Sequence, residues 1–78
     1  MSRPTNLEYY PTLILAEAYH TAIDEYYEAK NRGLVENVLL YYTPLALQRE
    51  LESRALDGSP AAYNSIKLAL IQGLYING

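Results

Sequence analysis

The four residues Asp57, Gly58, Ser59 and Pro60 constrain the fold of this chain more than any other part of its sequence. Glycine readily adopts the left-handed backbone conformation that ends a helix. Serine caps the free N–H groups at the start of a helix, and proline fits the first helical position because no N–H is needed there. The run therefore predicts one helix that ends near Asp57 and a second that begins at Pro60.

Further signals divide the rest of the chain into helices. Asn31, Arg32 and Gly33 are typical of a helix C-terminus. The residue before a proline avoids the helical region, so Thr43–Pro44 predicts a break between two helices. Between these signals, apolar residues recur at helical spacing. We therefore expect one all-α domain, a compact bundle of about four short helices at 11–31, 34–42, 44–57 and 60–76, preceded by an N-terminal arm or irregular turn at 1–10.

The size of the chain limits its stability. A domain of 78 residues hides only about 60% of the surface that its unfolded chain exposes. The sequence contains no cysteine, which excludes a disulfide framework and a thiolate zinc site. With 50% hydrophobic and 19% charged residues, the chain is not a disordered acidic tail. It must fold by packing alone or gain buried area by self-association.

Charge and hydropathy indicate where the protein acts. The net charge of −3 makes nucleic acid an unfavourable partner, since little in the chain neutralises a row of phosphates. No apolar run approaches the roughly 20 residues that span a bilayer, so we expect no membrane partner. The first residues lack the apolar core of a signal peptide. We expect a cytoplasmic protein.

The predicted helix at 60–76 is apolar on two sides and carries one charge, Lys67. The wide arc that we expect in the core comprises Ala62, Tyr63, Ile66, Ala69, Leu70, Gly73 and Leu74. Gly73 inside a helix predicts a close approach between helices. A narrower second row contains Leu68, Ile71 and Tyr75, which have no obvious partner within the monomer. Because an exposed apolar row usually marks an interface, we expect a homodimer through these residues.

Tyrosine is unusually frequent. The chain has nine tyrosines and no phenylalanine or tryptophan. A tyrosine ring packs against apolar groups while its hydroxyl stays in water, and tyrosine is enriched in protein interfaces. These rings either complete the edge of a thin core or lie in an interface. Tyr27 and Tyr41, each from an adjacent tyrosine pair, are candidates for the interface.

The predicted helix at 11–31 has an acidic outer face. Glu17, Asp24 and Glu28 lie on it with no lysine or arginine between them. This pattern is typical of a solvated face, and it also suits docking to a basic patch on another protein. Glu17 and His20 have the Glu-x-x-His spacing of di-metal helical bundles, yet they lie opposite the apolar stripe of their helix, so they are weak metal candidates.

The sequence contains no catalytic constellation. The single histidine, His20, has no cysteine partner and no serine in a nucleophile elbow, and no glycine-rich loop is built to hold phosphate. We expect no cofactor and a non-catalytic adaptor, regulator or inhibitor that acts through protein–protein contacts. Small acidic phage inhibitors of nucleic-acid-handling machinery share this size and charge, though no motif.

Two alternative functions stay open. One is a metal-binding helical dimer that uses Glu17 and His20. The other is a helix-turn-helix nucleic-acid-binding regulator built from the helices on either side of Thr43–Pro44, with Arg49 and Arg54 on its second helix.

Overall fold

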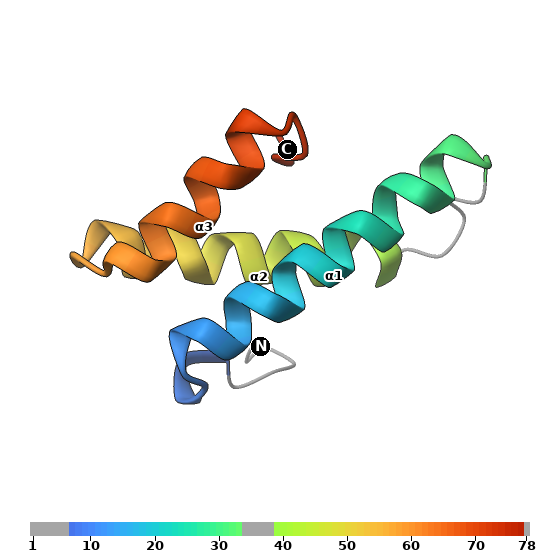
Figure 1. Ribbon diagram of the computed structural model, residues 1–78. Coiled ribbons are helices and arrows are strands. Elements are labelled where there is room, and N and C mark those ends of the chain that lie inside the picture. The colour runs from blue at the N-terminus through green and yellow to red at the C-terminus, as the bar shows by residue number, and fades with distance from the viewer. Residues whose placement is uncertain (1–6, 34–38, 78) are drawn as a thin grey trace.

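The computed structural model of the protein describes residues 7–33 and 39–77 (Figure 1). A short 3-10 turn, η1 (Leu7–Tyr9), precedes the helices α1 (Thr12–Asn31), α2 (Leu39–Leu56) and α3 (Pro60–Ile71). Throughout these described ranges the regular structure is helical and no strand occurs. The predicted all-α class is therefore confirmed.

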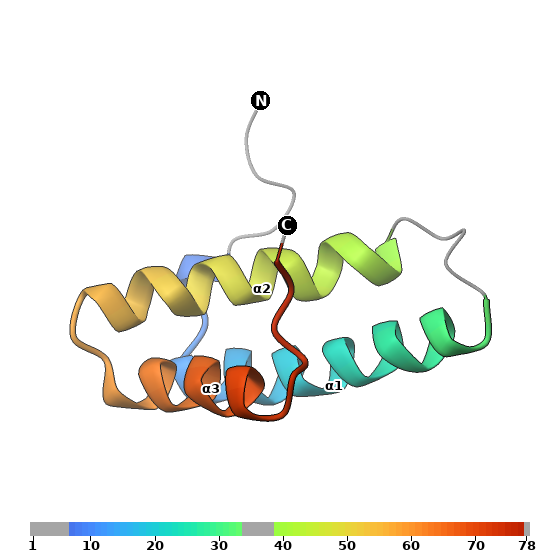
Figure 2. The same cartoon turned by 90° about the horizontal axis from the view of Figure 1, so that it is seen from above.

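The helices form two layers. Figure 2 shows α2 in one layer, with α1 and α3 packed against the same side of it in the other. The core lies between the layers and takes side chains from every helix. Its members are Leu15, Tyr19 and Ile23 of α1, Leu45, Leu47 and Leu51 of α2, Ala62, Ile66 and Ala69 of α3, and Ile76, which follows α3.

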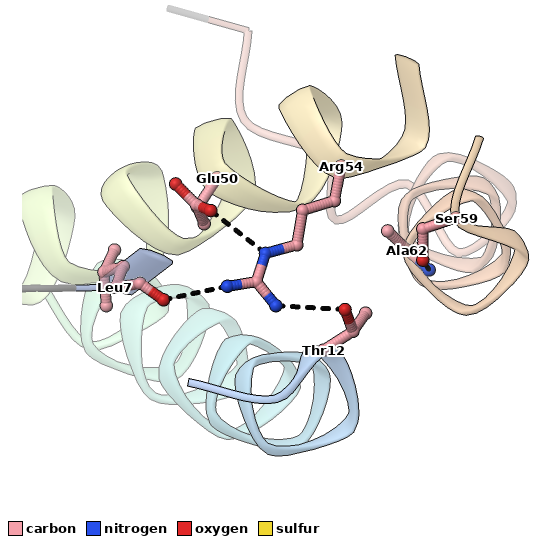
Figure 3. A network of polar contacts seen from close by, with 6 residues as sticks. All are labelled: Leu7, Thr12, Glu50, Arg54, Ser59 and Ala62. Atoms are coloured by element: carbon pink, nitrogen blue, oxygen red, sulfur yellow. Dashed lines mark hydrogen bonds and ion pairs between the residues drawn. The ribbon is translucent and has the colours of Figure 1, made fainter. Parts of the chain in front are cut away.

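The connection between α2 and α3 confirms the helix boundaries predicted at Asp57–Pro60. Gly58 has a φ of 99°, and the backbone N–H of Ser59 bonds back to the carbonyl of Arg54 at 2.9 Å. The Ser59 hydroxyl then accepts a 3.3 Å hydrogen bond from the N–H of Ala62, and Pro60 is the first residue of α3 (Figure 3). Glycine, serine and proline thus have the roles that their chemistry predicts.

The break predicted at Thr43–Pro44 is wrong. Pro44 lies inside α2, which runs continuously from Leu39 to Leu56, so the structure has three helices and not four. The part of the predicted helix 34–42 before Leu39 lies outside the described residues. A proline inside a helix loses one backbone hydrogen bond and crowds the preceding turn. Here the ring of Pro44 is fully buried, and its packing offsets that cost.

The end predicted for the last helix is also wrong. The helix α3 stops at Ile71, and the chain reverses at Gly73, whose φ is 73°. Two hydrogen bonds close the reversal: the N–H of Gly73 bonds to the carbonyl of Leu70, and that of Leu74 bonds to Ala69. A Cβ added at Gly73 would meet nothing within 4 Å. The glycine therefore supplies a backbone conformation and not the close helix approach that we expected.

Candidate protein interaction surface

The outer face of α3 exposes a row of large apolar side chains. Tyr63, Leu68, Leu70 and Ile71 are between 43% and 71% exposed, and the polar residues among them are Asn64 and Lys67. These six residues form what we call the α3 outer face. The α3 residues buried against the rest of the protein lie on the opposite side of the helix. A short helix with this much exposed apolar surface is unusual in a monomeric protein.

The core arc predicted for this helix is only partly correct. Ala62, Ile66 and Ala69 are buried as expected, whereas Tyr63 and Leu70 are exposed. The buried face is centred on small side chains, which include Ser65 as well as the two alanines. Small residues let α3 pack closely against its neighbours, so the larger flanking side chains project outward. The exposed apolar surface is consequently wider than the predicted row.

The five predicted interface residues lie in different environments. Leu68 and Ile71 are exposed on the α3 outer face. Tyr75 follows the helix and donates its hydroxyl to the carboxylate of Glu52. Tyr27 is half-buried against the core, with its ring 4.9 Å from that of Tyr26. The side chain of Tyr41 lies outside the described residues. Of the four predicted residues whose side chains are described, Leu68 and Ile71 share one open surface.

The acidic outer face of α1 is present in the structure. Glu17, Asp24 and Glu28 are all exposed. At its C-terminal end, Glu28 lies 3.5 Å from the guanidinium of Arg32, and both side chains are well exposed. A surface pair of this kind contributes little to stability. It partly neutralises one end of the face, while Glu17 and Asp24 keep the rest of it acidic.

His20 lies at the boundary between α1 and α3, away from the fully exposed position that the sequence suggests. Its Nε2 is 3.2 Å from the hydroxyl oxygen of Ser65, and its ring is half-buried beside Tyr19. Ser65 is itself buried, so the pair joins two helices. Glu17 is exposed, and the described residues contain no cluster of three or more histidine, aspartate or glutamate side chains that suits a metal ion.

A buried polar network, not predicted from the sequence, joins α1, α2 and the segment after α3. The Gln48 side chain, 1% exposed, accepts hydrogen bonds from the Tyr19 hydroxyl at 2.5 Å and the Ile76 N–H at 3.0 Å. Its Nε2 donates to the Ile76 carbonyl at 2.8 Å. Burial raises the pKa of Tyr19 well above its ordinary value, and the nearby Tyr75 and Glu52 add to the effect. Gln48 lies three residues before the buried Leu51, and this spacing was the available signal.

The charged residues in the second half of α2 are only partly solvated. Arg49 is exposed, but Arg54 and Glu50 are 17% and 12% exposed. Figure 3 shows Arg54 bonded to Glu50 at 3.0 Å, to the Thr12 hydroxyl at 3.0 Å and to the Leu7 carbonyl at 2.9 Å. Arg54 therefore fastens η1 and the start of α1 to α2. Glu50 lies four residues before Arg54, a spacing at which helical side chains meet, whereas Thr12 and Leu7 lie more than forty residues away in the chain.

Comparison of the chain with known protein families, curated proteins and solved structures gives no match. The candidate surface therefore depends on the geometry alone. Among the described helices, none combines the length and apolar character that crossing a bilayer requires. The continuous α2 also has no turn at Thr43–Pro44, which the alternative of a helix-turn-helix requires.

Proposed function

We propose that this protein is a small interaction protein that acts as a homodimer, with the α3 outer face as its dimer contact. The observation that carries the proposal is the set of four large apolar side chains, Tyr63, Leu68, Leu70 and Ile71, exposed on one twelve-residue helix. Exposed apolar surface of this kind favours association, because burying it removes apolar groups from water.

Charge favours a second copy as the occupant of this face. The chain has a net charge of −3, and the outer face of α1 concentrates acidic side chains. Two copies that met through this acidic face would repel each other. The α3 outer face has a single charge, Lys67, which lies among the apolar residues. Its long side chain can extend to solvent, so two such faces approach with less repulsion than two acidic faces. A twofold axis then buries the same residues on both copies.

The size of the face predicts a weak dimer. Full burial of one large apolar side chain is worth about 1.5–3 kcal/mol, and these side chains are already partly covered. Eight of them, four from each copy, must also offset an association cost of at least about 4 kcal/mol. We therefore expect a dissociation constant on the order of 100 μM, typical of a small and transient interface.

Sedimentation equilibrium on a matched pair of variants tests the proposal. Ile71→Lys places a charge in the middle of the contact, in the last turn of α3, where a cation suits the helix dipole. Leu13→Glu is the control, because the side chain of Leu13 is 69% exposed and that of Ile71 is 71% exposed. Leu13 lies in the first turn of α1, where the helix dipole favours a negative charge. Both variants should keep the helical circular dichroism of the wild type.

We expect the wild type and Leu13→Glu to dimerise at a few hundred micromolar, and Ile71→Lys to sediment as a folded monomer. A wild type that stays monomeric at this concentration would contradict the proposal. So would an Ile71→Lys variant that dimerises as strongly as the wild type, since the contact would then lie elsewhere.

A further inference from the structure

The segment Leu74–Asn77 leaves α3 and crosses back onto α2, as Figure 2 shows. Ile76 inserts its side chain into the core and is 6% exposed. One residue earlier, the hydroxyl of Tyr75 donates a hydrogen bond to Glu52 of α2. The segment has no regular secondary structure of its own, so these contacts with α2 and the core hold it in place.

Gln48 binds the backbone of this segment as a neighbouring β-strand would. Its side-chain amide receives the N–H of Ile76 and donates to the carbonyl of the same residue, at 3.0 Å and 2.8 Å. The Tyr19 hydroxyl also donates to Oε1 of Gln48, so this oxygen accepts one hydrogen bond from α1 and one from the segment. Because a backbone N–H only donates and a carbonyl only accepts, Ile76 determines which end of the Gln48 amide accepts and which donates.

The burial of Gln48 determines which kind of molecule can replace residues 74–77 on α2. Without the segment, the amide would keep only its bond from Tyr19 and would lose two of its three hydrogen bonds inside the protein. Unpaired polar groups in a buried position are costly. The pocket of Ile76 would also be empty. A suitable occupant must supply the backbone N–H and carbonyl of one residue to the Gln48 amide, and an aliphatic side chain to the pocket of Ile76. An extended peptide has these groups.

We propose that the surface formed by Gln48, Tyr19 and Glu52 is a binding site for an extended peptide segment of a partner protein, and that residues 74–77 occupy it as an internal ligand. The partner segment would place an aliphatic residue at the position of Ile76 and a tyrosine just before it, to reach Glu52. The site is separate from the α3 outer face, so its test is independent of the dimer.

Fluorescence anisotropy with a labelled synthetic peptide tests this proposal. The probe has the sequence of residues 73–77, and a scrambled peptide of the same composition is its control. The protein is the full chain with Ile76→Asp, because a charge does not enter the apolar pocket and the internal segment should leave the site. Asn77→Asp is the matched variant, because it adds the same charge at a neighbouring exposed residue and leaves Ile76 in place.

We expect Ile76→Asp to bind the probe at least about tenfold more tightly than the wild type or Asn77→Asp, in which the internal segment competes. Adding Gln48→Leu to Ile76→Asp should weaken binding at least about tenfold, because both hydrogen bonds to the peptide backbone are lost. A folded Ile76→Asp variant that binds neither peptide, or binds both equally, would overturn the proposal.

A second measurement covers the case in which Ile76→Asp does not fold. Isotope-labelled wild-type protein is titrated with the same peptide at millimolar concentration and followed by NMR. Binding should move the side-chain amide signals of Gln48 and shift the backbone signals of 74–77 toward those of a free segment. Unchanged signals at these residues would overturn the proposal.

Discussion

The hydroxyl of Tyr19 in α1 donates a 2.5 Å hydrogen bond to Oε1 of Gln48 in α2, and both side chains are buried. The bond joins the two longest helices through a polar contact inside an otherwise apolar core. Because Gln48 also pairs with the backbone of Ile76, one side chain connects α1, α2 and the segment after α3. Removing any member of this network should therefore affect the stability of the whole domain.

Tyr19→Phe should lower the free energy of unfolding by about 1 kcal/mol. The ring still fills the core, while Oε1 of Gln48 keeps its bond from Ile76, so only one hydrogen bond is lost. Urea denaturation followed by circular dichroism measures the change. Tyr9→Phe is the control, because Tyr9 is exposed and its variant should stay within about 0.5 kcal/mol of the wild type. Equal stability of the two variants would contradict a role for the buried bond.

Stability should fall at alkaline pH. The hydrogen bond to Glu52, followed by burial, raises the pKa of Tyr75 in the folded protein, and burial raises the pKa of Tyr19. A raised pKa means that the folded state holds the proton more tightly than the unfolded state does. The stabilisation is thus complete below the ordinary tyrosine pKa of 10.0 and is lost as the pH rises above it.

Urea denaturation between pH 8 and pH 11 tests this dependence, with tyrosinate absorbance recorded in parallel. In Tyr75→Phe the free energy of unfolding should decline less steeply above pH 10 than in the wild type, because one of the two tyrosines with a raised pKa is absent. Identical declines in the two proteins would show that Tyr75 does not contribute.

Arg54→Ala should destabilise the protein by about 2 kcal/mol. The guanidinium supplies hydrogen bonds to a carboxylate, a hydroxyl and a backbone carbonyl from a largely buried position. Arg54→Lys should recover only part of the loss, because one ammonium does not reproduce the planar geometry of these three bonds. Arg49→Ala on the same helix is the control, since Arg49 is exposed. Thermal denaturation of the three variants should rank Arg54→Ala lowest, and an Arg49→Ala variant of equally low stability would contradict the argument.

Gly73→Ala should destabilise the protein by about 1 kcal/mol although alanine is the better helix former. The φ of 73° disfavours any residue with a Cβ, whereas space around the position is open. Gly73→Asn should lose less stability than Gly73→Ala, because asparagine tolerates the left-handed region better than alanine. Chemical denaturation of both variants measures the difference. An Ala variant as stable as the wild type would mean that α3 extends through residue 73 in solution.

The backbone preferences of neighbouring residues made several helix boundaries predictable. The turn at Asp57–Pro60 and the end of α1 before Gly33 depend on residues adjacent in the chain, and both form as predicted. The same local rules failed at Pro44 and Gly73. At Pro44, burial of the ring outweighs the preference of proline for a helix start. At Gly73, apolar spacing that continues past Ile71 predicts a longer helix, but the apolar residues after Ile71 belong to a segment that packs on α2.

The sequence by itself determined the all-α class, the capped turn between α2 and α3, the acidic outer side of α1 and the exposed pair Leu68 and Ile71. Helical periodicity and backbone preferences of glycine, serine and proline act within a few residues, so they can be recognised along the chain. Only the tertiary structure placed Gln48 against Tyr19 and Ile76, and Arg54 against Thr12 and Leu7. These partners lie 28 to 47 residues apart, and the packing of the two helical layers alone brings them within hydrogen-bond distance.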